Sequence, residues 1–146
     1  MGLFSKKPNQ HDAFMIKQKI QELNYYNETI ARMDNVEGFL NQIGGLKNTV
    51  IDMQKYERKY PDVFNPKPSK ILKNFETNKL ILEKNFIDRY LLAIERKLLN
   101  YSTMRGKTNN FNKMVDIFKY YAGEFEPENV NYFSIKLQER FPEFYQ

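Results

Sequence analysis

The chain of 146 residues contains no cysteine and a single histidine, His11. The absence of cysteine excludes disulfides, thiolate metal sites and a thiol nucleophile. One histidine also excludes the common metal sites that use two or three histidines. A catalytic base has to be held beside a second reacting group, so we expect His11, near the N-terminus, to be a solvated side chain.

The motifs of several enzyme classes are missing as well. No GxxxxGK[ST] phosphate loop and no GxSxG nucleophile motif occurs, and one histidine gives no credible Ser-His-Asp set. The sequence therefore predicts no catalytic residue, no metal ligand and no bound cofactor.

Long apolar runs are also missing, because no segment approaches the about 18 residues needed to span a bilayer. The start, MGLFSKK, is followed by no apolar stretch of the kind a secretory signal carries. We expect residues 1–11 to be a flexible leader, residues 12–146 to be a single domain, and the protein to be cytoplasmic.

Apolar residues recur at gaps of three and four along most of the chain, which is the spacing of one helix face. No segment shows the alternation of a strand. The sequence predicts an all-α fold, an antiparallel bundle of four to five helices. The expected helices cover residues 12–33, 35–60, 70–104, 109–122 and 127–141.

Glycines and prolines interrupt this pattern and predict where helices end. Gly44-Gly45 interrupts the second helix, but the apolar stripe resumes in phase, so we favour a continuous helix with a close packing contact there. Pro61 ends that helix at Tyr60 and opens a stiff loop over residues 61–69. The expected helix boundaries are set by Asp12, Ser69, Gly106, Thr108 or Asn109, Gly123, Pro127 and Pro142.

Basic residues outnumber acidic ones by 23 to 18, which gives a net charge of +5 and an isoelectric point near 9.2. A mild positive balance permits nucleic acid, anionic membranes or acidic proteins as partners. The middle of the chain is the most basic part. The candidate polyanion-binding residues are Lys67, Lys70, Lys73, Arg89 and Arg96.

Two pairs of carboxylates are seven residues apart on the third predicted helix, Glu76 with Glu83 and Asp88 with Glu95. Helical bundles that hold two metals add an ExxH motif, which this chain lacks. We expect these carboxylates to lie on a solvated, salt-bridged face.

Aromatic residues gather towards the end of the chain. The candidate protein interface consists of Phe133, Phe141, Phe144 and Tyr145, since exposed aromatic side chains favour protein contacts. The alternative is a tail packed onto the bundle, which we favour slightly.

Three segments together resemble a known bacterial family. They are KQKIQEL at 17–23, FLNQIGGLKNTVIDMQKYERKYPDVF at 39–64 and NFIDRYLLAIERKLLNYSTM at 85–104. Their order and helix pattern are similar to those of the 5-bromo-4-chloroindolyl phosphate hydrolysis proteins. The resemblance implies a bacterial helical protein and hydrolysis of phosphate esters, with no catalytic residue to carry over.

These observations favour a small adaptor or accessory protein that binds another protein, or a second copy of itself, and has no enzymatic activity. Nucleic-acid binding through the basic residues is the alternative. Weak phosphohydrolase activity, implied by the resemblance alone, is the third hypothesis.

Overall fold

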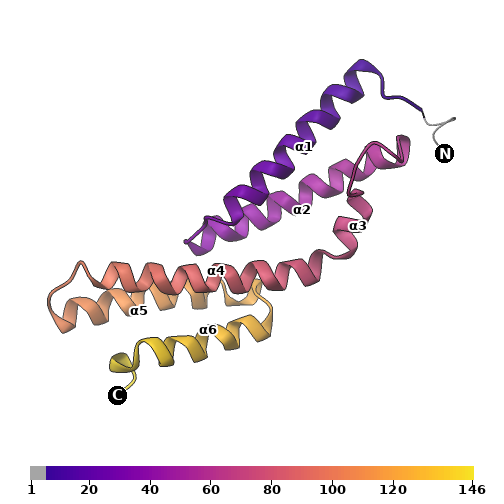
Figure 1. Ribbon diagram of the computed structural model, residues 1–146. Helices are drawn as coiled ribbons and strands as arrows, with labels where there is room; N and C mark the ends of the chain where they lie inside the picture. The colour runs from indigo at the N-terminus through magenta and orange to yellow at the C-terminus, as the bar shows by residue number, and fades with distance from the viewer. Residues whose placement is uncertain (1–5) are drawn as a thin grey trace. The chain divides into compact units, whose positions relative to one another are not determined.

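The computed structural model describes residues 6–146, and this part of the chain is all helical, as predicted (Figure 1). It contains six α-helices and two short 3-10 helices instead of four or five helices. The α-helices are α1 (Gln10–Ile30), α2 (Val36–Lys59), α3 (Pro68–Lys73), α4 (Phe75–Leu98), α5 (Met104–Tyr120) and α6 (Pro127–Arg140), and the 3-10 helices are η2 (Ala122–Glu124) and η3 (Pro142–Phe144). Across residues 6–146 no helix is long and apolar enough to cross a membrane.

These helices form two compact units. The first contains residues 6–30 and Asn41–Lys79, and the second contains Ala31–Leu40 and Leu80–Gln146. Two helices, α2 and α4, each continue from one unit into the other. In the second unit α4, α5 and α6 run back and forth beside one another (Figure 1).

Helix α1 begins at Gln10, earlier than expected, so two residues of the predicted leader are helical. The other leader residues include 1–5, which lie outside the described part of the chain. The side-chain oxygen of Asn9 accepts a hydrogen bond from the backbone N–H of Asp12 at 2.8 Å. The helix is therefore capped by Asn9, and the prediction of Asp12 as the cap was wrong.

Asp12 instead joins the two long helices of the first unit. Its carboxylate is buried, and it accepts hydrogen bonds from the Tyr60 hydroxyl at 2.5 Å and from the Lys59 ammonium at 2.9 Å. These bonds hold the pKa of Asp12 below its usual range, with the Lys59 bond as the main cause. They fix the start of α1 against the end of α2.

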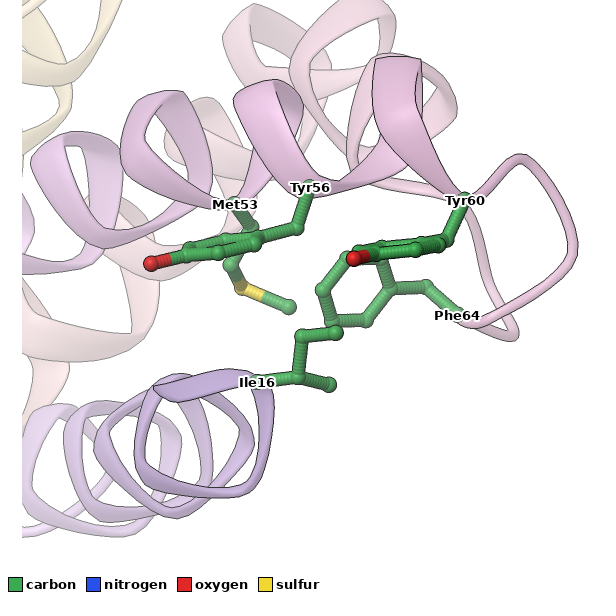
Figure 2. Close-up of a cluster of buried hydrophobic side chains, with 5 residues drawn as sticks. All are labelled: Ile16, Met53, Tyr56, Tyr60 and Phe64. Carbon is green, nitrogen blue, oxygen red and sulfur yellow. The ribbon is translucent and has the colours of Figure 1, made fainter. Parts of the chain in front are cut away.

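An apolar cluster of the first unit lies beside this pair (Figure 2). Ile16 projects from α1 towards Met53 and Tyr56 of α2 and towards Tyr60, which directly follows that helix. Phe64 of the following loop closes the cluster. All five side chains are buried, so the loop is packed onto the helices.

Gly44-Gly45 leaves α2 unbroken, as predicted, but the two glycines have different surroundings. A Cβ atom on Gly45 would lie 2.5 Å from ring carbons of Tyr26 in α1, whereas a Cβ on Gly44 would meet nothing within 4 Å. The close packing contact is therefore made by Gly45 alone. α2 ends at Lys59, one residue before the predicted end at Tyr60.

The predicted helix 70–104 is divided into α3 and α4. α3 begins at Pro68, with Lys67 as its N-cap, so Ser69 is not the cap. The backbone N–H of Ser69 donates instead to the Glu57 carboxylate at 2.7 Å. The division falls at Asn74, whose N–H closes the last turn of α3 while its carbonyl accepts from Asn78.

α4 also ends earlier than predicted, at Leu98, and the next helix begins earlier than predicted, at Met104. Thr103 caps α5 by accepting a hydrogen bond from the N–H of Gly106 at 3.1 Å. Gly106 therefore lies in the first turn of α5 instead of ending α4, and the predicted caps Thr108 and Asn109 lie inside this helix.

The bounds of the last helix agree with the prediction, since α6 starts at Pro127 and ends before Pro142.

The prediction that Glu83 lies on a solvated face was wrong, because its side chain is buried in the second unit. It accepts hydrogen bonds from the Asn129 amide at 2.9 Å and from the N–H of Glu126 at 3.0 Å. A carboxylate at the start of α6 also interacts favourably with the helix dipole.

The core of the second unit is aromatic. Phe39 of α2 stacks on Phe86 of α4, with ring centroids 4.4 Å apart, and both rings contact Phe125. Phe118 of α5 stacks on Phe133 of α6 at 3.9 Å. These rings hold the helices of the unit together.

The glycine pair provides a matched test of the packing in the first unit. We expect Gly44→Ala to raise the free energy of unfolding by about 0.5–1 kcal/mol, because alanine favours a helix and the site is open. We expect Gly45→Ala to lower it by about 1–2 kcal/mol, because the new methyl group would overlap the Tyr26 ring. Urea unfolding followed by circular dichroism measures both. Equal effects of the two substitutions would contradict the Gly45 contact.

The lowered pKa of Asp12 makes a second prediction. A carboxylate whose pKa is lower in the folded state stabilises the fold above its unfolded pKa of about 3.9, and this contribution is lost as the pH falls through the folded pKa. We expect Asp12→Asn to be less stable than the wild type at neutral pH and to lose less stability below about pH 4. Thermal unfolding across this range tests it, and parallel pH profiles for the two proteins would count against the pairing.

Candidate protein-binding groove

The predicted aromatic interface is mostly core. Phe133 and Phe141 are buried in the second unit, and Phe144 stacks on Phe111 of α5 with centroids 4.3 Å apart. Tyr145 is 47% exposed, and its ring contacts the same Phe111 ring edge-on. The C-terminal segment therefore packs onto α5, which leaves little aromatic surface there for a partner.

The predicted polyanion-binding residues do not form one cluster within a unit. Lys67, Lys70 and Lys73 are exposed in the first unit, whereas Arg89 and Arg96 belong to the second. Arg89 is half-buried, and its Nε donates a hydrogen bond to the carbonyl of Met33 at 2.7 Å. Arg89 therefore ties the segment before α2 to α4.

Of the remaining predicted carboxylates, Asp88 has a structural role, whereas Glu76 and Glu95 are exposed. Asp88 accepts a hydrogen bond from the Tyr132 hydroxyl at 2.6 Å, which joins α4 to α6. This bond and partial burial raise the pKa of Tyr132. In residues 6–146, no group of three or more His, Asp or Glu side chains is placed to hold a metal ion.

A groove of about 590 Å³ lies in the second unit, between the start of α2 and the second half of α5. Its volume is within the range of ligand-binding sites. The residues that line it are Asn35, Val36, Glu37, Lys113, Asp116, Ile117, Tyr120 and Tyr121.

Helix α5 supplies the longer wall of this groove. Lys113, Asp116, Ile117 and Tyr120 follow the spacing of one helix face, while Phe111, Val115 and Phe118 face the core. Ile117 and Tyr120, one turn apart on this wall, are 46% and 82% exposed. The sequence did contain a signal, because both residues fall outside the apolar stripe that predicts this helix.

The start of α2 supplies the other wall. The Asn35 side chain accepts a hydrogen bond from the N–H of Gly38 at 2.7 Å, which caps the helix and places Val36 and Glu37 at its first turn. Gly38 is needed here, since a Cβ would lie 2.6 Å from the Asn35 oxygen. Sequence reasoning did not find this wall, because it lies about 80 residues before the other.

The polar groups of the groove are mainly acidic. Glu37 and Asp116 line it together with one base, Lys113. Partial burial and the nearby Glu37 carboxylate raise the pKa of Tyr121. The Tyr120 ring lies edge-on to Tyr121, with centroids 4.9 Å apart.

No family model, curated protein or solved structure matches this chain.

The wall at α2 depends on its cap. We expect Asn35→Ala to lower the free energy of unfolding by about 1 kcal/mol, because the N–H of Gly38 loses its partner. Asn35→Asp should retain most of the stability, since a carboxylate oxygen also caps a helix. Chemical unfolding of the three proteins tests this, and an unchanged Asn35→Ala midpoint would show that the cap contributes nothing.

Proposed function

We propose that this chain is a non-enzymatic protein-binding module of the cytoplasm, which holds a short segment of a partner protein in the groove between α2 and α5. The observation that carries the proposal is the exposure of Ile117 and Tyr120 along one wall of this groove. Large apolar side chains that line a concavity are typical of surfaces that bind a partner.

The lining indicates which segment fits. Ile117, Tyr120 and the ring of Tyr121 form an apolar wall that suits one aliphatic or aromatic anchor side chain. Glu37 and Asp116 on the same groove favour a lysine or arginine next to that anchor. The expected partner is therefore a peptide segment with an apolar anchor beside a basic residue.

Weak phosphohydrolase activity, which only the resemblance to the phosphate hydrolysis proteins implies, remains the third proposal. Nucleic-acid binding is the second candidate function, supported by the exposure of Lys67, Lys70 and Lys73. Nucleic-acid binding of this kind also uses aromatic rings on which bases stack. Among the tyrosines of the first unit, Tyr56 and Tyr60 are buried and Tyr25 is exposed.

The proposal is tested by selecting peptides from a random display library on the full chain. We expect the selected peptides to share an apolar residue next to lysine or arginine. Fluorescence polarisation with one such peptide should then show about tenfold or greater loss of affinity for Tyr120→Ala and for Ile117→Asp.

The matched control is Ile135→Asp on α6, where the isoleucine is 47% exposed against 46% for Ile117. This variant should bind the peptide with wild-type affinity. Equal losses for both aspartate variants, or a library that yields no anchored peptides, would overturn the groove as the binding site. If the full chain instead binds single-stranded nucleic acid with a steep salt dependence, and this binding is lost in Lys67→Gln, Lys70→Gln, Lys73→Gln, the second candidate is favoured.

A further inference from the structure

Two exposed apolar side chains lie at the turn from α4 to α5, one in the connection and one at the first residue of α5, at the end of a helical hairpin (Figure 1). Leu99 is 80% exposed and Met104 is 57% exposed. Both line a hollow of about 230 Å³ whose inner side is formed by Leu98, Phe141 and Phe144. We call this end of the second unit the hairpin tip, and it is separate from the peptide groove.

Basic side chains lie within three residues of Leu99 or Met104 along the chain, or line the same hollow. Those within or lining the tip are Arg96, Lys97, Arg105, Lys107 and Arg140, against the acidic Glu95 and Glu143. The hairpin tip therefore has five basic and two acidic side chains, a net charge of +3. All of them except the half-buried Lys107 are exposed.

The combination of exposed apolar and basic side chains distinguishes between three possible partners: a second copy of the chain, nucleic acid and an anionic bilayer. A second copy of the same surface would bring two groups of like charge together. Nucleic acid would pair with the basic residues, but leucine and methionine provide no ring on which bases stack. An anionic bilayer satisfies both features, because lipid phosphates attract lysine and arginine while apolar side chains enter the acyl boundary.

We propose that the hairpin tip docks the protein on an anionic lipid surface, with Leu99 and Met104 inserted and the basic residues at the level of the headgroups. Since this surface does not overlap the lining of the peptide groove, the protein could hold a partner while on the membrane. The inference does not depend on the proposed function of the groove.

The test is sedimentation of the full chain with vesicles of phosphatidylcholine alone or mixed with phosphatidylglycerol. We expect binding only to the mixed vesicles. Arg96→Gln, Lys97→Gln, Arg105→Gln should weaken it by about a hundredfold, at roughly fivefold for each charge. The triple variant Lys67→Gln, Lys70→Gln, Lys73→Gln removes the same charge from the first unit and should bind far more strongly.

Insertion needs its own measurement. Leu99→Ser with Met104→Ser should weaken binding about tenfold or more. Its control is Ile81→Ser with Leu92→Ser, because Ile81 is 57% exposed, as Met104 is, and lies elsewhere on α4. The chain contains no tryptophan, so Leu99→Trp provides a single reporter. Its emission should shift to shorter wavelength on mixed vesicles, and that of Ile81→Trp should not.

Three outcomes would overturn the proposal. The first is no binding to mixed vesicles at low salt. The second is binding that the control variants weaken as much as the hairpin-tip variants do. The third is binding with no emission shift at Leu99→Trp, which would show electrostatic attraction without insertion. Self-association that is lost in the Leu99→Ser and Met104→Ser variant, without vesicle binding, would assign the hairpin tip to a second copy.

Discussion

The second unit depends on the stacking of aromatic rings from four helices and one connection. Phe39, Phe86 and Phe125 form one stack, and Phe118 with Phe133 forms another that contacts it. Rings of this size bury much apolar area and are rigid, so each fixes the rotation of the helix that carries it. Because Phe118 points into the core, Ile117 and Tyr120 of the same helix have to point outwards. The position of the groove follows from the packing behind it.

Buried polar groups determine how these helices align along their lengths. The Tyr90 hydroxyl donates to the carbonyl of Met114 at 2.6 Å, and the Asn129 amide donates to Glu83 and to the carbonyl of Leu80. Burial raises the pKa of the Tyr90 phenol. A shift of α5 or α6 by one turn would separate these groups, and a buried polar group without a partner destabilises a fold. Hydrogen bonds between buried polar groups thus fix the register of these helices, which apolar packing alone would leave free to shift.

The two proposed binding surfaces of the second unit differ in charge. The groove presents Glu37 and Asp116 against Lys113, whereas the hairpin tip presents five basic residues against two acidic ones. The net charge of +5 for the whole chain conceals this difference, because a sum carries no positions. Separation of charge over one small unit allows it to attract a basic peptide at one place and an anionic surface at another.

The sequence by itself determined the helical class and many helix ends, because period and punctuation are local properties. Pro61, Pro127 and Pro142 each lie within two residues of a helix end. The in-phase apolar stripe correctly predicted that α2 continues across Gly44-Gly45. The boundary between two successive helices was harder to predict. Thr103 caps α5, so this helix begins at Met104, a residue that the periodicity assigned to the preceding helix. Only the tertiary structure decided that Glu83 is buried, that Asp12 pairs with Lys59, and that Ile117 lies across a groove from Val36. Periodicity identifies the faces of a helix, but which faces meet depends on packing between residues far apart in the chain.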